Sequence, residues 1–348
     1  MKKYILALCL FFYSALLAAN SLLGLPTLKI PSDNPQSIAK IALGKKLFND
    51  KRLSLDGTIS CASCHDKEKA FTDGQAGAVG IDQQVGVRNA PTVVNAAFYQ
   101  TLFLDGRAGS LEEQALGPFV NPIEHGLKDK HAIVDIVQQD VQYRHEFLQV
   151  FATSTITAKQ IGQAIASFER TIIAGNSAFD RYLFARDRQA LTASEARGMR
   201  LFRRKGNCAN CHEISGKDAL FMDNRFYNLG VGFNKINPQI AEFVQSLRAG
   251  KAASEFDFSA AQRAELGRFN VTNVIADIGK FKTPTLRNIA LTAPYLHDGS
   301  VQTLEEVVEY YDKGGEKNPF LDSAIFPLHL TDQEKQDLVA FLKALTSE

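Results

Sequence analysis

The sequence predicts a mainly α-helical protein made of two related domains, and three observations support this prediction. The chain has 348 residues, which suits two domains of ordinary size. Two Cys-x-x-Cys-His pentapeptides, at 61–65 and 208–212, are each followed by a similar series of motifs. Thr-x-x-Glu patterns that begin helices occur at 192–195 and 331–334, and no sustained alternation of apolar and polar residues indicates a large sheet.

The N-terminal residues form a predicted secretory signal. Lys2 and Lys3 precede an apolar run from residue 4 to residue 19 that ends in small alanines. This order is typical of a signal peptide, whereas about 16 apolar residues are few for a membrane span. An uncleaved anchor is the alternative. We expect residues 1–19 to be removed and the mature protein to be soluble in the periplasm.

The composition excludes several classes of protein. With 45% hydrophobic and 22% charged residues, the chain is not expected to be disordered. Lys and Arg number 39 and Asp and Glu 38, so no nucleic-acid partner is expected. Of five cysteines, Cys9 lies in the predicted signal and four lie in the pentapeptides, which excludes a scaffold of disulfides.

The pentapeptides predict two covalently bound c-type haems. In this motif two thiols add to the vinyl groups of one haem, and the adjacent histidine ligates the iron. A zinc site or redox dithiols are alternatives, but neither requires a histidine directly after each pair. We expect His65 and His212 to ligate iron in two class I cytochrome c-like helical domains. The attaching side chains would be Cys61, Cys64, Cys208 and Cys211.

The motifs around the pentapeptides indicate an internal duplication. A Gly-x-x-Leu-Phe segment precedes each pentapeptide, at 44–48 and 198–202. Further along, Pro284 follows Pro91 by 193 residues within matching Pro-Thr-x-x-Asn segments. The distance from the pentapeptide to the Pro-Thr segment is longer in the second domain than in the first. We therefore expect an insertion in the second domain at about 231–280.

The residue on the far side of each haem decides whether that haem transfers electrons or binds a substrate. A far-side methionine is not expected. The two methionines beyond the predicted signal, Met199 and Met222, closely flank the second pentapeptide, and neither lies on a plausible far-side segment.

The duplication predicts different far sides for the two haems. Two helices that begin with Leu-Glu-Glu motifs, at 111–113 and 304–306, should cross the far faces. Tyr311 is in register with Pro118, since each lies seven residues after the leucine of its motif. Tyrosine ligates iron as a phenolate, whereas proline has no donor. We therefore predict that His212 and Tyr311 ligate the second haem and that the first is open. The alternative is that Tyr311 is an ordinary half-buried tyrosine beside Tyr310.

Two polar side chains are candidates for the open pocket. Gln114 and Glu124 follow the first Leu-Glu-Glu motif. A carboxylate over the iron can take a proton from one peroxide oxygen and return it to the leaving oxygen, while an amide orients the peroxide. Equally, both residues can be surface residues at the end of a helix.

The chain resembles the bacterial dihaem cytochrome c peroxidase family, and within it the MauG-like branch. The resemblance covers nearly the whole mature chain and rests on both pentapeptides and several further motifs. These are Arg88-Asn89-Ala90-Pro91-Thr92, Asp105-Gly106-Arg107, the Gln114–Pro118–Glu124 spacing, Thr283-Pro284-Thr285-Leu286-Arg287-Asn288 and Pro294-Tyr295-Leu296-His297-Asp298-Gly299.

The resemblance implies roles for particular residues. The N-terminal haem would be the peroxidatic one, served by Gln114 and Glu124, and the C-terminal haem would transfer electrons. Ordinary members use methionine where Tyr311 stands. They also place a histidine on the resting first haem, which this chain lacks, so no reductive activation is expected. The family's calcium ion between the haems would be held by the Asn89 side chain and the carbonyls of Thr292 and Pro294.

Some residues depart from the family or carry two interpretations. No tryptophan is present, and the family's tryptophan positions fall on Leu104 and Gly206. Arg107 follows a tight turn, where it can pair with a haem propionate or form a salt bridge within the turn. For His297, a hydrogen bond to a propionate or to the backbone is favoured over iron ligation.

These observations together predict a periplasmic dihaem c-type peroxidase. It would reduce hydrogen peroxide at an N-terminal peroxidatic domain (20–185) with electrons passed through a C-terminal electron-transfer domain (186–348). The donor would be a small c-type cytochrome, a cupredoxin or an oxidisable protein substrate. The alternatives are MauG-type oxidative modification of a partner protein and a non-catalytic dihaem electron carrier. A homodimer is also expected, because members of the family often dimerise.

Overall fold

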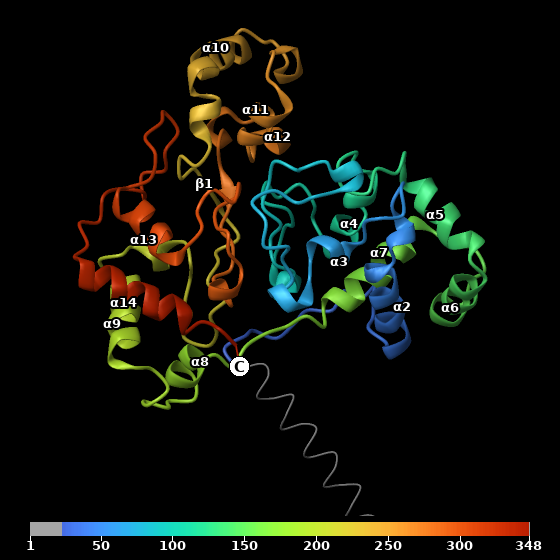
Figure 1. Cartoon of the computed structure of the whole chain (residues 1–348), viewed down its shortest axis with the longest axis horizontal. Coiled ribbons are helices and arrows are strands. Elements are labelled where there is room, and N and C mark those ends of the chain that lie inside the picture. The colour runs from blue at the N-terminus through green and yellow to red at the C-terminus, as the bar shows by residue number, and fades with distance from the viewer. Residues whose placement is uncertain (1–22, 348) are drawn as a thin grey trace, which may run out of the picture.

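The computed structural model describes residues 23–347 and shows a mainly helical protein. Two lobes lie side by side, with the N-terminal lobe on the right of Figure 1 and the C-terminal lobe on the left. The expected mainly α fold is confirmed. The predicted signal at 1–19 lies outside the described residues.

Six α-helices form the N-terminal half within the described residues. They are α2 (Ile38–Asn49), α3 (Cys61–Cys64), α4 (Leu111–Gln114), α5 (Lys130–Gln139), α6 (Val141–Phe151) and α7 (Ala158–Glu169). The long helices α2 and α7 pack against each other. Their apolar faces enclose one hydrophobic core, with fully buried members such as Leu53, Ile161 and Ile165.

The C-terminal half repeats this arrangement. Its helices are α8 (Ala178–Leu183), α9 (Ala193–Arg203), α10 (Asn237–Arg248), α11 (Ala260–Glu265), α12 (Phe269–Thr272), α13 (Leu304–Asp312) and α14 (Asp332–Lys343). Helices α9 and α14 pack together as α2 and α7 do, around a core that includes Phe202 and Phe341. Thr192 and Thr331 cap α9 and α14 in capping boxes, as their sequence patterns predict.

One glycine in each domain permits the close crossing of its helix pair. A Cβ at Gly44 in α2 would lie 1.8 Å from the Ala164 carbonyl oxygen of α7. A Cβ at Gly198 in α9 would lie 1.9 Å from the Asp337 carbonyl oxygen of α14. The Gly-x-x-Leu-Phe segments therefore repeat because both domains need the same backbone approach.

A buried ion pair joins distant parts of the C-terminal half. Arg287 and Asp180 of α8 form two hydrogen bonds of 2.8 Å, and both side chains are fully buried. Arg287 also donates to the backbone carbonyls of Gly24 and Ala219. Because Phe179 of α8 packs in the second core, the chain enters this core before residue 185. The domain division at 185 and 186 stays a prediction.

The segment expected as an insertion forms a small third core. Phe243 lies at its centre, surrounded by other buried apolar residues of 233–278. In Figure 1 helices α10 to α12 stand above both lobes. The Arg268 guanidinium donates to the carbonyls of Asp105 and Gly106, and Arg88 donates to the Ala264 carbonyl. The insertion therefore ties the second domain to the first.

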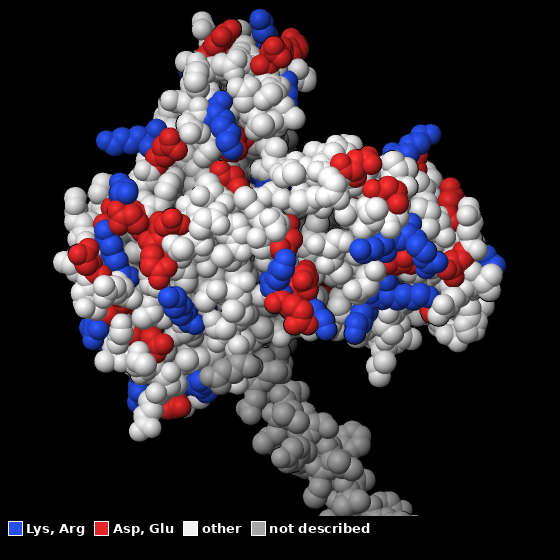
Figure 2. Space-filling model, viewed as in Figure 1, with Lys and Arg blue, Asp and Glu red and all other residues white. Residues whose placement is uncertain are grey.

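A short two-stranded sheet lies beside the insertion. Strand β1 (Phe226–Tyr227) pairs antiparallel with β2 (Phe281–Lys282), with Phe226 opposite Lys282. On the face in Figure 2, positive and negative side chains are intermingled without a large patch of one sign. Among residues 23–347, no helix has both the length and the apolar character that crossing a bilayer requires.

The helix crossing gives a test of the duplicated fold. We expect Gly198→Ala to lower the free energy of unfolding by about 1–3 kcal/mol, because the added methyl group meets a backbone oxygen that cannot rotate away. Gly216→Ala is the matched control, since a Cβ there has nothing within 4 Å. Chemical denaturation of the two variants measures the difference. Equal stabilities would show that the crossing is not close.

Candidate haem sites

The two pentapeptide histidines have the same local geometry. His65 Nδ1 lies 3.1 Å from the carbonyl oxygen of Phe71, and His212 Nδ1 lies 2.8 Å from that of Phe221. This bond makes Nδ1 the donor and leaves Nε2 free as a ligand. Burial lowers the pKa of both histidines, which favours the neutral form that binds iron. A Phe-x-Asp segment follows each pentapeptide, at 71–73 and 221–223, and its phenylalanine supplies the carbonyl that orients the histidine.

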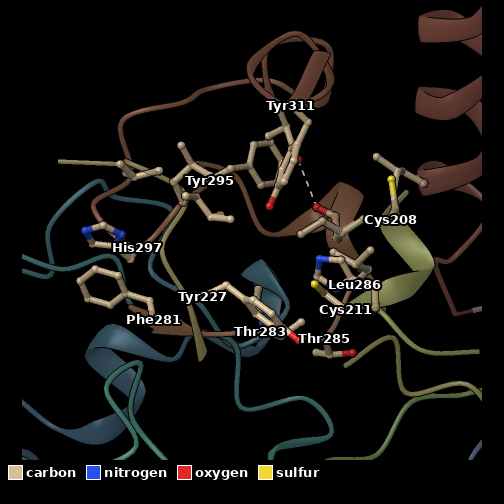
Figure 3. Close-up of a pocket in the computed structure, with 18 of the residues that line it drawn as sticks. Cys208, Cys211, Tyr227, Phe281, Thr283, Thr285, Leu286, Tyr295, His297 and Tyr311 are labelled. Atoms are coloured by element: carbon tan, nitrogen blue, oxygen red, sulfur yellow. Dashed lines mark hydrogen bonds between the residues drawn. The ribbon is translucent and has the colours of Figure 1, made fainter. Parts of the chain in front are cut away.

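A cavity of about 260 Å³ surrounds the second pentapeptide. Cys208, Cys211 and His212 line it together with Tyr311 from the last turn of α13. Figure 3 shows Tyr311 reaching from its helix toward the space flanked by the two cysteines. The predicted pair of His212 and Tyr311 therefore faces one cavity.

The neighbouring tyrosine is engaged elsewhere. The Tyr310 hydroxyl donates to the Leu229 carbonyl at 2.8 Å. Within residues 23–347 the Tyr311 hydroxyl has no hydrogen-bond partner, and burial raises its pKa. Met199 is buried in the second core and Met222 is also buried, and neither is among the described residues that line the cavity.

A second, smaller cavity adjoins the first pentapeptide. Cys61, Cys64 and His65 line it, and so do the three residues whose spacing was singled out in the sequence. Those residues are Gln114, Pro118 and Glu124. The structure thus brings the predicted residues together in one cavity, where Gln114 and Glu124 are half-buried.

The helices over the two cavities differ in length. α13 runs for nine residues and carries Tyr311 near its end, whereas α4 stops at Gln114 after four. A short 3-10 helix (Pro118–Val120) follows α4. Pro118 is the first residue of this 3-10 helix, and its side chain carries no donor that could serve as a ligand.

Burial and two neighbouring polar groups have opposite effects on the pKa of Glu124. Burial raises the pKa of Glu124, while the Arg107 charge and a hydrogen bond from Asn121 lower it. The Asn121 amide donates to Glu124 Oε1 at 2.6 Å. Gly80 lets the loop of residues 77–86 pass directly under this segment, since a Cβ there would lie 1.8 Å from the Ile123 carbonyl oxygen.

Two further residues of this cavity were not identified from the sequence. His125 is buried, with Nδ1 at 3.0 Å from the Leu53 carbonyl oxygen and its ring edge-on to Phe119. Glu169 at the end of α7 is only 5% exposed. Neither residue has a signal in the sequence, because nothing local shows that the end of α7 and the residue after Glu124 meet at the first pentapeptide.

Comparison with known proteins identifies the family. The di-haem cytochrome c peroxidase family model matches residues 38–188, and the cytochrome c model matches residues 195–346. Cytochrome-c peroxidase IdrP1 of Pseudomonas sp. (strain SCT) is 38% identical over 92% of this chain and 84% of its own length. Methylamine utilization protein MauG of Methylorubrum extorquens is 35% identical over 91% and 81%.

The chain belongs to the dihaem cytochrome c peroxidase family. A solved MauG-like protein associated with microbial copper homeostasis has a TM-score of 0.76 and 36% identity, and covers 93% of this chain and 94% of its own. The diheme peroxidase BthA from Burkholderia thailandensis, at 23% identity and a TM-score of 0.71, shares the fold. The predicted family is confirmed, and the chain is an oxidoreductase of the cytochrome-c peroxidase type.

The residues of this family member fit two c-type haems. All four pentapeptide thiols are free and line the two cavities with their histidines. The cavity walls are otherwise largely apolar, as haem requires; for the second they include Leu338 and Leu342. The two cytochrome c domains thus imply two haems, held by Cys61, Cys64 and His65 and by their counterparts in the second domain.

Residues between the domains were expected to hold calcium. Asn89 Nδ2 lies 3.2 Å from the Pro294 carbonyl oxygen and 2.9 Å from the Gln75 carbonyl oxygen. Thr292 lines the cavity at the second pentapeptide, as Asn89 and Pro294 do. The Asn89 amide donates to both carbonyls through its nitrogen, whereas calcium requires oxygen ligands, so the calcium site stays a prediction. Within the described residues, no cluster of three or more His, Cys, Asp or Glu forms a metal site.

Arg107 and His297 have partners within the protein. Arg107 forms a salt bridge of 2.9 Å with Asp105, which is the turn pairing that the sequence also allowed. His297 Nε2 lies 2.8 Å from the Glu265 carboxylate of the insertion, and its ring stacks on Phe281. The expected propionate or backbone bond of His297 stays a prediction. The structure adds a partner that the sequence did not indicate, because the insertion brings a carboxylate that the repeat pattern does not contain.

Proposed function

We propose that this protein reduces hydrogen peroxide at its first haem, with electrons delivered through its second haem. The asymmetry of the two cavities carries the proposal. Tyr311 faces the second cavity with a free hydroxyl. At the first cavity the corresponding helix, α4, ends at Gln114, and Pro118 stands at the position that corresponds to Tyr311. One site therefore has an additional ligand, and the other has room for a small oxidant.

The side chains of the first cavity suit proton transfer to peroxide. Haem, when bound, supplies an iron that binds peroxide and accepts its oxidising equivalents. Glu124 takes the proton from one peroxide oxygen and returns it to the leaving oxygen, and Gln114 donates a hydrogen bond that orients the peroxide. Asn121 fixes one Glu124 oxygen, which leaves the other for the proton. The Arg107 charge helps to keep part of the Glu124 population ionised.

The second site suits an electron relay. His212 and Tyr311 would hold the second haem on both faces, so exogenous ligands are excluded and electrons pass without chemistry there. The physiological donor would be a small periplasmic cytochrome c or cupredoxin. Tyr99 joins the domains here, because its hydroxyl accepts a hydrogen bond from the Thr285 amide at 2.7 Å.

A second candidate function is oxidation of a partner protein. The 35% identity to the named methylamine utilization protein MauG, together with a tyrosine on the second cavity, favours it over a simple electron carrier. Rapid peroxide turnover only with a reduced small cytochrome supports the peroxidase. Consumption of peroxide without it, with an oxidised partner protein as product, supports the modifying role.

Further features complete the proposal. The signal at 1–19 directs the chain to the periplasm, and the domains at 20–185 and 186–348 carry the peroxidatic and the electron-transfer haem. Calcium is held by Asn89, Thr292 and Pro294, Arg107 supports the first haem, and the protein forms a homodimer.

The tyrosine ligand has a matched control in the neighbouring residue. We expect Tyr311→Phe to remove the low-spin signal of the second haem from the electron paramagnetic resonance spectrum of the oxidised protein, because phenylalanine has no donor. Tyr310→Phe should leave that signal unchanged, since its hydroxyl bonds to Leu229. An unchanged spectrum in Tyr311→Phe would contradict tyrosine ligation.

The role of Glu124 predicts a pH dependence. A carboxylate must be ionised to accept a proton, and burial raises its pKa, so the rate constant for reaction with peroxide should rise with pH through a midpoint above 4.5. In Glu124→Gln the rate constant should fall about 10²–10⁴-fold and lose this dependence. Stopped-flow single-turnover measurements test both. Glu113→Gln, at an exposed position of α4 next to Gln114, should resemble the wild type, and loss of rate there would count against a specific role.

The calcium proposal is tested by metal analysis. Elemental analysis of the purified protein should find one calcium per chain, and Asn89→Ala should lower this content because its side-chain ligand is lost. Asn49→Ala, at the exposed last residue of α2, is the control. Equal calcium in both variants, or none in the wild type, would refute the assignment.

A further inference from the structure

A second carboxyl group lies in the first cavity beside the proposed catalytic one. Glu169, the last residue of α7, lines this cavity and is 5% exposed. Its Oε2 is inaccessible to water and has no hydrogen-bond partner, and the side chain forms no salt bridge among residues 23–347. Because an unpaired buried carboxyl group is costly, its presence needs a reason beyond packing.

The duplicated domain shows which residue the fold itself accepts there. Ala164 of α7 and Asp337 of α14 are equivalent, since each carbonyl faces the crossing glycine of its domain. Five residues later stand Glu169 in the first domain and Leu342 in the second. Leu342 is buried and lines the second cavity. Leucine satisfies the packing at this position, so the glutamate is specific to the first site.

The surrounding charges leave Glu169 without a partner. The nearest cation, Arg170, forms a salt bridge of 2.7 Å with Glu112 of α4. Burial raises the pKa of Glu169 to about 8; the Arg170 charge opposes this shift and the Glu112 charge adds to it. The other titratable groups that face the same cavity are Cys61, Cys64, His65, Glu124 and His125.

We propose that Glu169 exchanges one proton with solvent in step with the oxidation state of the first haem. Glu169 takes up one proton when that haem accepts one electron, and it releases the proton when the electron leaves. The net charge of the cavity is then unchanged at each step. In a buried, poorly solvated site an uncompensated unit charge is expensive, and a carboxyl group without a fixed partner is free to compensate it.

The inference rests on the proposed function only in requiring a haem at the first pentapeptide. It adds a positioning and tuning role that Glu124 does not fill. Glu124 transfers protons to and from peroxide, whereas Glu169 sets the charge balance of the site. A leucine here would make the fold more stable and the potential of the first haem independent of pH.

The test is a spectroelectrochemical titration of the holoprotein from about pH 5 to about pH 10. A tenfold change in proton concentration corresponds to 59 mV for a one-electron couple. In the wild type the midpoint potential of the first haem should therefore fall with pH, by up to 59 mV per pH unit, between the pKa of Glu169 in the oxidised and reduced states. The second haem should not share this slope.

Matched variants assign the slope to one carboxyl group. Glu169→Gln keeps the size and polarity of the side chain but cannot titrate, so the slope should disappear. Glu124→Gln removes the other carboxyl group of the cavity and should keep the slope. If Glu169→Gln does not fold, Glu169→Leu restores the residue of the second domain and should flatten the slope while raising the thermal unfolding temperature.

The outcomes separate this inference from the proposed function. A slope that persists in Glu169→Gln or Glu169→Leu, or a wild-type potential that does not vary with pH, would overturn the inference. Either result leaves the proposed function standing if the first haem still reacts with peroxide. Failure of the first haem to react with peroxide, with the slope present, would remove the proposed function and keep the proton coupling.

Discussion

The orientation of each haem-site histidine is the constraint on which the rest of the structure depends. His65 and His212 each bond through Nδ1 to the carbonyl of a phenylalanine six or nine residues later. This bond fixes the orientation of the ring, and the adjacent cysteines would attach the haem beside it. Both domains repeat this arrangement together with the glycine that allows their main helices to cross. The near side of both sites is therefore the same.

Function then depends on how the far sides differ. A nine-residue helix brings Tyr311 to the second cavity, while Pro118 follows an early helix end at the first. The space thus made is lined by Gln114, Glu124 and Glu169. Duplication supplied two equal haem-binding units, and a few substitutions gave one of them a cavity with two carboxyl groups. Leu342 at the position of Glu169 shows how small these changes are.

The insertion joins the two units into one molecule. Its Arg268 donates to two carbonyls of the first domain, and its Glu265 accepts from His297 beside the second cavity. Glu265 also forms a salt bridge with Lys235. These contacts tie the insertion to both domains. The sequence contains no tryptophan, and Tyr99 is one side chain that contacts both domains.

The sequence by itself determined the helical class, the haem-attachment residues, the family and the register of Tyr311 with Pro118. These follow from local spacing and from repetition, both of which are visible along the chain. Tertiary structure decided what depends on contacts between distant segments. It engaged Tyr310 with Leu229, gave His297 a carboxylate partner, and buried Glu169 without one. Spacing along the chain cannot show these facts, because hydrogen bonding and desolvation depend on which atoms the folded chain brings together.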